Sequence, residues 1–307
     1  MEHKRIKIIL SLVLAVACAV VAVVLVSVNR KKGFVPQSAV DDLIGILAES
    51  GIETDPSVIV TKKVKAKVYV CGEGGASDYN RDVASLISGS GIDKTYATPG
   101  GEILVTRDGA LFEMGDDYYF RYSFDGKKRE MPDVSAMPDI SEEIGEDRGE
   151  IEKTVSDFLA RGSKNFGLSG RISVETHADR IATDGEKYYV LCSRTIDGVE
   201  VTGNTVVCSL DRAGNVTDAS GVWCFLAGGE AYSAQLCDVL NILFSAGSAI
   251  SAENAGKVRI ESVGLCYSLY YYGGGEKFCL IPCWQVVTES NGIFIYNALD
   301  GTFYTKK

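Results

Sequence analysis

The hydrophobic positions of this chain follow three patterns. Between Ile8 and Val28 they form one run of 21 residues without a charge. After Pro36, apolar residues three or four apart predict amphipathic helices, and short runs rich in Val, Ile, Tyr and Phe predict strands. The chain therefore starts with one long apolar segment and continues as a mixture of helices and strands.

The run from Ile8 to Val28 is long enough to cross a bilayer as a helix, since the bilayer core is about 30 Å thick and a helix rises about 1.5 Å per residue. A cleaved signal peptide has a shorter apolar region, of about 7–15 residues. Because residues 29–32 are polar and basic, we expect an uncleaved single-pass anchor within residues 1–32. Three basic residues on each side give no orientation, but the short head favours a cytoplasmic N-terminus and an extracytoplasmic bulk.

Four small residues lie three or four positions apart in this apolar run, namely Ser11, Ala15, Ala19 and Ala22. They share one face of a helix, and small residues allow close approach of a second helix in lipid. We interpret this face as a candidate membrane-helix interface. The alternative is a plain anchor, because alanine is common in any membrane span.

Residues 36–131 are predicted to form an N-terminal α+β domain. Apolar positions from Val40 to Leu47 predict a first helix, with Ser38 as its cap. A strand is expected over Val58 to Cys71 and a second helix near Arg81 to Ile87. Asp108-Gly109 then joins two strands as a hairpin.

An acidic linker is predicted over residues 132–150, since Pro132 to Glu152 holds eight acids, two prolines and one arginine. The C-terminal α+β domain, 151–307, is expected to contain two helix-plus-sheet units. Their helices start at Ile151 and at Ser233, and each is followed by strands. A helix that covers one face of an antiparallel meander is typical of the α+β class.

Charge excludes one class of partner. Beyond residue 32 the chain has 25 basic and 40 acidic side chains, a formal charge of −15. A part of the chain that is this acidic repels nucleic acid, so we expect no nucleic-acid partner.

Eight cysteines lie outside the apolar run, at positions 71, 192, 208, 224, 237, 266, 279 and 283. Their even number would permit disulfides in an exported protein. Most follow strand-like alternation, as Cys208 does between Val206 and Leu210, which favours small buried thiols.

Catalytic chemistry has few candidates in the sequence. The two histidines, His3 and His177, do not suffice for a common zinc site or a serine triad. The glycine-rich stretch from Gly72 to Ser77 departs from the dinucleotide fingerprint at its third glycine, and the strand before it alternates lysine with Val or Ala. We therefore expect no catalytic, metal or cofactor-binding residues and no cofactor.

Two segments carry a resemblance to a known architecture. "YYVLCSRTIDGVEVTGNTVVCSLDRAGNVTDASG", residues 188–221, resembles a strand-turn-strand segment of the propeptides of thermolysin-like proteases. "IPCWQVVTESNGIFIYNALDGTFY", residues 281–304, is similar to the end of the same PepSY/cystatin-like architecture. Both pieces behind one N-terminal transmembrane helix resemble the YycI/YycH-type regulators, which are accessory membrane proteins of a two-component cell-wall sensor kinase.

The resemblance implies a non-catalytic protein that regulates or interacts, with a membrane sensor kinase or a related accessory protein as the expected partner. Two alternatives remain open. One is an extracytoplasmic binding module for a small ligand or peptidoglycan fragment, which a pocket with converging polar groups would favour. The other is a protease inhibitor that acts in trans.

Overall fold

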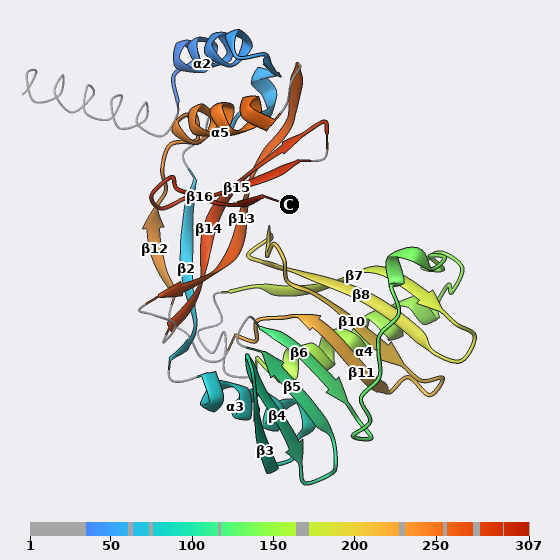
Figure 1. Cartoon of the computed structure of the whole chain (residues 1–307). Helices are drawn as coiled ribbons and strands as arrows, with labels where there is room; N and C mark the ends of the chain where they lie inside the picture. The colour runs from blue at the N-terminus through green and yellow to red at the C-terminus, as the bar shows by residue number, and fades with distance from the viewer. Residues whose placement is uncertain are drawn as a thin grey trace, which may run out of the picture. The chain divides into compact units, whose positions relative to one another are not determined.

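The structure is a computed structural model that describes residues 35–60, 64–73, 76–115, 118–163, 172–226, 231–253, 257–272, 277–290 and 292–306. It has the expected α+β architecture (Figure 1). None of the helices in these ranges is long and apolar enough to cross a membrane. The expected span Ile8 to Val28, with Ser11, Ala15, Ala19 and Ala22, lies outside the described residues.

The chain divides into two compact units rather than at the boundaries expected from the sequence. The described residues of Met1–Lys65, Gln235–Gly264 and Trp284–Lys307 belong to unit 1, whereas Ala66–Ala234 and Leu265–Cys283 make up unit 2. Each unit is therefore assembled from segments far apart in the chain.

Unit 2 is built around a nine-stranded sheet made from two helix-plus-meander modules. The first module is α3 (Ala76–Ser88), β3 (Ile92–Thr98), β4 (Gly101–Thr106), β5 (Leu111–Gly115) and β6 (Tyr119–Ser123). The second is α4 (Asp147–Arg161), β7 (Val174–Thr183), β8 (Tyr188–Ile196), β10 (Thr205–Leu210) and β11 (Val216–Val222), with the short β9 (Val199–Glu200) paired to β8. The order β3-β4-β5-β6-β11-β10-β8-β7 places the last strand of each module at the centre.

The two modules join by antiparallel pairing of β6 with β11. In this seam Tyr122 lies opposite Ala219, and Phe120 lies opposite Gly221. Strands from the ranges 36–131 and 151–307, which were expected to form separate domains, thus belong to one sheet. Two such modules each present an unpaired edge strand, and the seam removes both edges at once.

Helices α3 and α4 cover one face of this sheet and contact each other (Figure 1). Helix α4 has the stripe expected from the sequence, with Ile151, Val155, Phe158 and Leu159 buried. The rings of Phe158 and Tyr122 lie 5.1 Å apart between their centroids. The helix-covered face is therefore the apolar core of unit 2.

The segment that was expected to be a solvated linker, 132–150, is bound to strand β7. The amide of Ile140 donates to the carbonyl of Ile181 at 2.8 Å, and the amide of Ile181 donates to Ser141 Oγ at 3.1 Å. Val134, in the short 3-10 helix η2 (Val134–Ala136), is 2% exposed. The acidic composition of residues 132–150 indicated solvent exposure. Two of these acids, Asp133 and Asp139, instead accept hydrogen bonds within local turns.

Unit 1 contains α2 (Gln37–Glu49), α5 (Val239–Glu253), and strands β1 (Ile52–Thr54), β15 (Ile293–Asn297) and β16 (Phe303–Lys306). Helix α2 is confirmed, with Val40, Leu43 and Leu47 buried. Ser38 does not cap it, because the helix already begins after Pro36, and no side chain caps that end.

The helix expected from Ser233 begins six residues later. Ser233 lies in strand β12 (Ala231–Gln235), which pairs with β2 (Lys65–Glu73). The side chain of Asp238 accepts from the amide of Leu240 at 3.1 Å, so α5 starts at Val239. Phe244 in this helix is 58% exposed.

Strands β13 (Val258–Tyr272) and β14 (Lys277–Thr288) contribute residues to both units. They belong to a seven-stranded sheet with the path β1-β13-β14-β15-β16, to which β2 and β12 attach. The edge strand β3 was not expected, because most of its side chains are exposed and leave little hydrophobic pattern.

We predict that the pairing of β11 with β10 tolerates no side chain at Gly221. A Cβ there would lie 2.3 Å from the carbonyl oxygen of Thr205, so the strands would have to separate. Gly221→Ala should lower the free energy of unfolding by about 1–3 kcal/mol. Urea unfolding followed by the fluorescence of Trp223 and Trp284 measures it.

The matched control is Gly264→Ala, since a Cβ on this glycine of β13 meets nothing within 4 Å. Its unfolding free energy should stay within about 0.5 kcal/mol of wild type. Equal losses in the two variants would contradict the close approach of β10 to Gly221.

Candidate functional site: a buried arginine beside a cavity

The structure gives the residues singled out in the sequence mostly structural places. His177 lies on β7, with Nε2 3.0 Å from Thr195 Oγ1. In the described part of the chain, no group of three or more His, Cys, Asp or Glu side chains is placed to hold a metal ion. Cys71, Cys192, Cys208 and Cys224 are buried thiols, as their alternation indicated.

Three charged side chains of the nine-stranded sheet in unit 2 are buried, Glu102, Arg194 and Asp218, and the two most deeply buried lie on opposite faces. Asp218, 4% exposed, lies on β11 on the face away from α4, since its neighbour Ala219 faces the core. Arg194, 1% exposed, lies on β8 on the helix-covered face. Their surroundings differ, and the difference identifies the candidate site.

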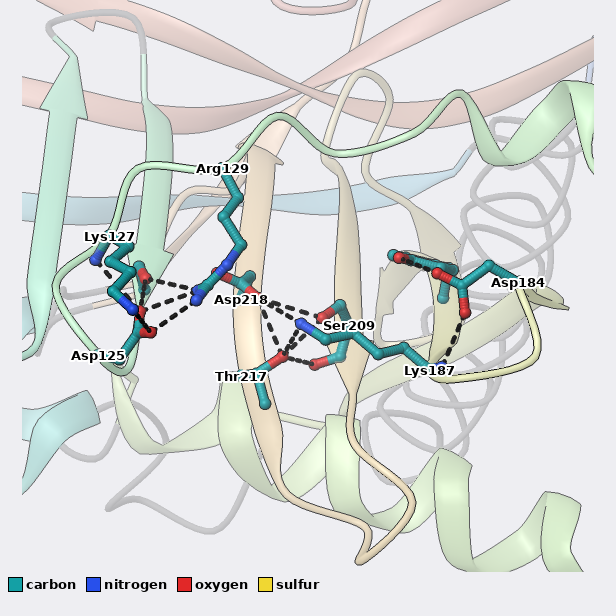
Figure 2. A network of polar contacts seen from close by, with 10 residues as sticks. Asp125, Lys127, Arg129, Asp184, Lys187, Ser209, Thr217 and Asp218 are labelled. Carbon is teal, nitrogen blue, oxygen red and sulfur yellow. Dashed lines mark hydrogen bonds and ion pairs between the residues drawn. The ribbon is translucent and has the colours of Figure 1, made fainter.

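The Asp218 carboxylate is saturated by polar contacts (Figure 2). Arg129 donates to Oδ1 at 3.0 Å, and Lys187 donates to Oδ2 at 3.1 Å. The hydroxyls of Thr217 and Ser209 donate to Oδ2 at 2.9 and 3.3 Å. Figure 2 shows the two cations approaching Asp218 from different sides, one from the segment after β6 and one from the turn before β8.

These contacts keep Asp218 ionised. Burial raises the pKa of the carboxyl, but the hydrogen bonds from Lys187 and Arg129 outweigh burial and hold the pKa below its ordinary value. Arg129 also pairs with Asp125 at 2.6 Å. Because the two cations fully compensate the negative charge of Asp218, we interpret these contacts as a structural ion-pair cluster that holds the segment after β6 against β11.

Arg194 lies on the face of β8 whose other side chains are buried in the apolar core. The burial of β8 alternates, and Val190, Cys192 and Ile196 on the same face are all fully buried. The guanidinium lies over the ring of Trp223, 5.0 Å from its centroid. Arginine is rarely buried without a partner, so its polar contacts decide its role.

Two nitrogens of this guanidinium, Nε and Nη2, are buried and have no hydrogen-bond partner among the described residues. Removing such a donor from water costs about 1–3 kcal/mol, and more when the group is charged. An arginine cannot lose its proton to avoid the cost. Two donors of the Arg194 guanidinium thus lack a hydrogen-bond partner, whereas both oxygens of the Asp218 carboxylate have partners.

A cavity of about 300 Å³ lies beside Arg194, between α4 and the strands β7 and β8. Its wall has an apolar part and a polar part that includes three hydroxyl groups. The lining residues are Ser156, Leu159, Ala160, Ser163, Val174, Thr176, Arg194 and Trp223. This combination of one cation, hydroxyls and apolar walls suits a small anionic ligand.

The Cys224 thiol is a further neighbour of the guanidinium. Burial raises its pKa, but a hydrogen bond with Cys71 and the positive charge of Arg194 more than offset this, so the pKa lies below its ordinary value. Burial raises the pKa of Cys71.

A larger cavity of about 430 Å³ is a weaker candidate, because its carboxylates are already engaged. Asp211 accepts from the amides of Ala213 and Asn215, and Asp108 accepts from the hydroxyl of Thr106. The cation in its wall, Arg161, is exposed to solvent. No open buried charge faces this second cavity among the residues that line it.

Comparisons with known proteins do not assign the site. No family model matches the chain, and no curated protein matches it. Among solved structures it is similar to an uncharacterized protein from Eubacterium rectale ATCC 33656, with 12% sequence identity, a TM-score of 0.43, and coverage of 83% of this chain and 90% of that chain. This likeness carries no functional assignment.

Sequence reasoning missed Arg194, although a signal for it exists. In "VLCSRTI", residues 190–196, every second residue is apolar except for the arginine. A charged residue in the buried register of a strand marks either an ion pair or a binding site. The sequence could not tell which, because the partners come from other elements.

We predict that Asp218→Asn destabilises the protein by about 2–4 kcal/mol at pH 7, because it leaves two cations without their shared carboxylate. The pKa of Asp218 is lowered in the folded protein. Its contribution is therefore complete above the unfolded pKa of about 3.9 and is lost as pH falls below it. The difference between variant and wild type should shrink in that acid range.

Urea unfolding at several pH values measures this difference. Asp179→Asn serves as control, because Asp179 is exposed on β7 and accepts one hydrogen bond, from Ser193 at 2.9 Å. It should change stability by less than about 0.5 kcal/mol. If Asp218→Asn lowers the free energy of unfolding no more than the control does, the structural role of this ion-pair cluster is wrong.

Proposed function

We propose that this chain is a non-catalytic binding protein with a regulatory role, anchored in a cell membrane by Ile8 to Val28. Its bulk lies on the extracytoplasmic side and takes a small ligand into the cavity beside Arg194. The observation that carries the proposal is the fully buried guanidinium with two open nitrogens at a cavity.

The wall of that cavity favours binding over catalysis. Proton transfer needs a group that can gain and lose a proton near neutral pH, which is most often a histidine or a carboxylate. None of the residues described as lining the cavity is a histidine, a carboxylate or a cysteine. Arginine and serine or threonine hydroxyls instead hold and orient a ligand.

The regulatory part of the proposal comes from the resemblance of residues 188–221 and 281–304 to the PepSY/cystatin-like part of YycI/YycH-type regulators. The first segment covers β8 to β11 of the second module, in which a helix is followed by four principal antiparallel strands. That order supports a PepSY/cystatin-like module. A membrane sensor kinase or related accessory protein is the partner that the resemblance implies.

Membrane attachment is tested by fractionation and by reporter fusions. We expect the full chain to stay with the membrane after carbonate washing, because 21 uncharged residues bury themselves in lipid. A reporter fused after Lys307 should be active only outside the cytoplasm. Release by carbonate would remove the anchor from the proposal, and a reporter active only inside would reverse the orientation.

The anchor should also contribute to partner binding. Replacing Ala15, Ala19 and Ala22 by leucine keeps the segment hydrophobic but blocks close helix packing. We expect the triple variant to remain in the membrane and to lose most of any co-purifying membrane partner. The control replaces Val16, Val20 and Val23, on another face, by leucine. An equal effect of both triple variants would reduce the segment to a plain anchor.

A further inference from the structure

We infer that the cavity beside Arg194 selects ligands with a single carboxylate group, which the guanidinium holds. The inference rests on the proposed binding function and adds the chemical class of the ligand. It follows from the geometry of the donor group, from the charge around the cavity and from the apolar part of its wall.

The donor geometry favours a planar anion with two oxygens. A guanidinium offers parallel N–H groups that match the two oxygens of a carboxylate, and such a pair is stronger than a neutral hydrogen bond. In Arg194 the nitrogens without a partner are Nε and Nη2, which are both closed off from solvent, so a carboxylate reaches them by displacing neighbouring side chains. In arginine these two nitrogens lie on the same edge of the guanidinium and donate side by side. The stacked Trp223 ring restricts how that edge can turn.

The charge around the cavity favours a monoanion. Arg194 is the only basic residue among those described as lining it, and the chain beyond residue 32 carries a formal charge of −15. A phosphate, with about 1.5 to 2 negative charges near pH 7, would remain undercompensated by a single guanidinium. A carboxylate is neutralised by one cation.

The apolar part of the wall favours a short hydrocarbon next to the carboxylate. Leu159, Ala160 and Val174 provide this part, and Trp223 adds an aromatic ring. The hydroxyls of Ser156 and Thr176 lie in the same wall and can bond a polar substituent. A volume of about 300 Å³ is at the lower end of small-molecule sites, so the ligand is small.

The first test compares probes of equal shape and different charge on the full chain in detergent. Acetate, isovalerate and phenylacetate are titrated against acetamide, isovaleramide, phenylacetamide and inorganic phosphate at constant ionic strength. We expect at least one carboxylate to raise the midpoint of thermal unfolding in a saturable way and to quench Trp223 fluorescence. Its own amide and phosphate should bind at least about tenfold more weakly.

Variants of Arg194 provide the matched comparison. Arg194→Gln should weaken the carboxylate at least about tenfold and abolish the preference over the amide, whereas Arg194→Lys should retain part of it. Arg194→Met needs no ligand: because two guanidinium nitrogens are buried without a partner, this variant should have a midpoint of unfolding equal to or above that of the ligand-free wild type. Arg161→Gln, at the other cavity, should bind the carboxylate as wild type does.

The outcomes separate the ligand class from the proposed function. If amides or phosphate bind at Arg194 as well as carboxylates do, the protein is a binding protein but the carboxylate class is wrong. If none of the probes changes the unfolding midpoint and Arg194→Met lowers it, Arg194 is a paired structural residue. The site and the binding function that rests on it would then both be wrong.

Discussion

The antiparallel pairing of β6 with β11 is the constraint on which the rest of unit 2 depends. It converts two helix-plus-meander modules into one nine-stranded sheet, brings α3 and α4 together on one face, and aligns Ser123 opposite Asp218. Each module alone would expose an edge strand and an incomplete core. On its other side β11 pairs with β10, where Gly221 lets the backbones approach, because a side chain would meet the carbonyl of Thr205.

Asp218 and Arg194, the two most deeply buried charged side chains of this sheet, meet the cost of burial in different ways. Asp218 receives two cations and two hydroxyls, so its burial ties the segment between β6 and α4 to the sheet. Arg194 has a ring beneath it, a thiol nearby and a cavity at its side, but no carboxylate contacts it among the described residues. The compensated charge of Asp218 stabilises the fold, whereas the unpartnered nitrogens of Arg194 are the basis of the proposed ligand site.

Much of the secondary structure follows from the sequence, since periodicity reports burial directly. The apolar stripe of α4 and the alternation of buried and less buried residues in β8 and β10 can be read from the sequence of each element alone. The start of α5 was misplaced because Ser233 resembles a cap, while the pairing of β12 with β2 depends on a strand more than 150 residues away. Domain boundaries failed for the same reason, because the residues of β6 do not show that β11 is their partner.

No sequence motif identifies the candidate site, because the site is defined by a buried side chain that lacks hydrogen-bond partners. Arg194 stands in plain alternation with Cys192 and Ile196, but its cavity is formed by α4 and β7 from other parts of the chain. Only the assembled sheet shows that the guanidinium is buried and that two of its nitrogens have no hydrogen-bond partner. All its lining residues lie in the second module or directly after it, so the site needs α4, β7 and β8 to be assembled.

Hydrogen exchange measured by mass spectrometry tests the joint folding of the two modules most directly. If β6 and β11 form one seam, the amides of both strands should be protected to the same degree and should be released together with those of β8 and β10 as urea is added. The account predicts one cooperative transition for residues 76–226. Release of residues 76–123 at a clearly lower urea concentration than residues 147–226 would contradict it.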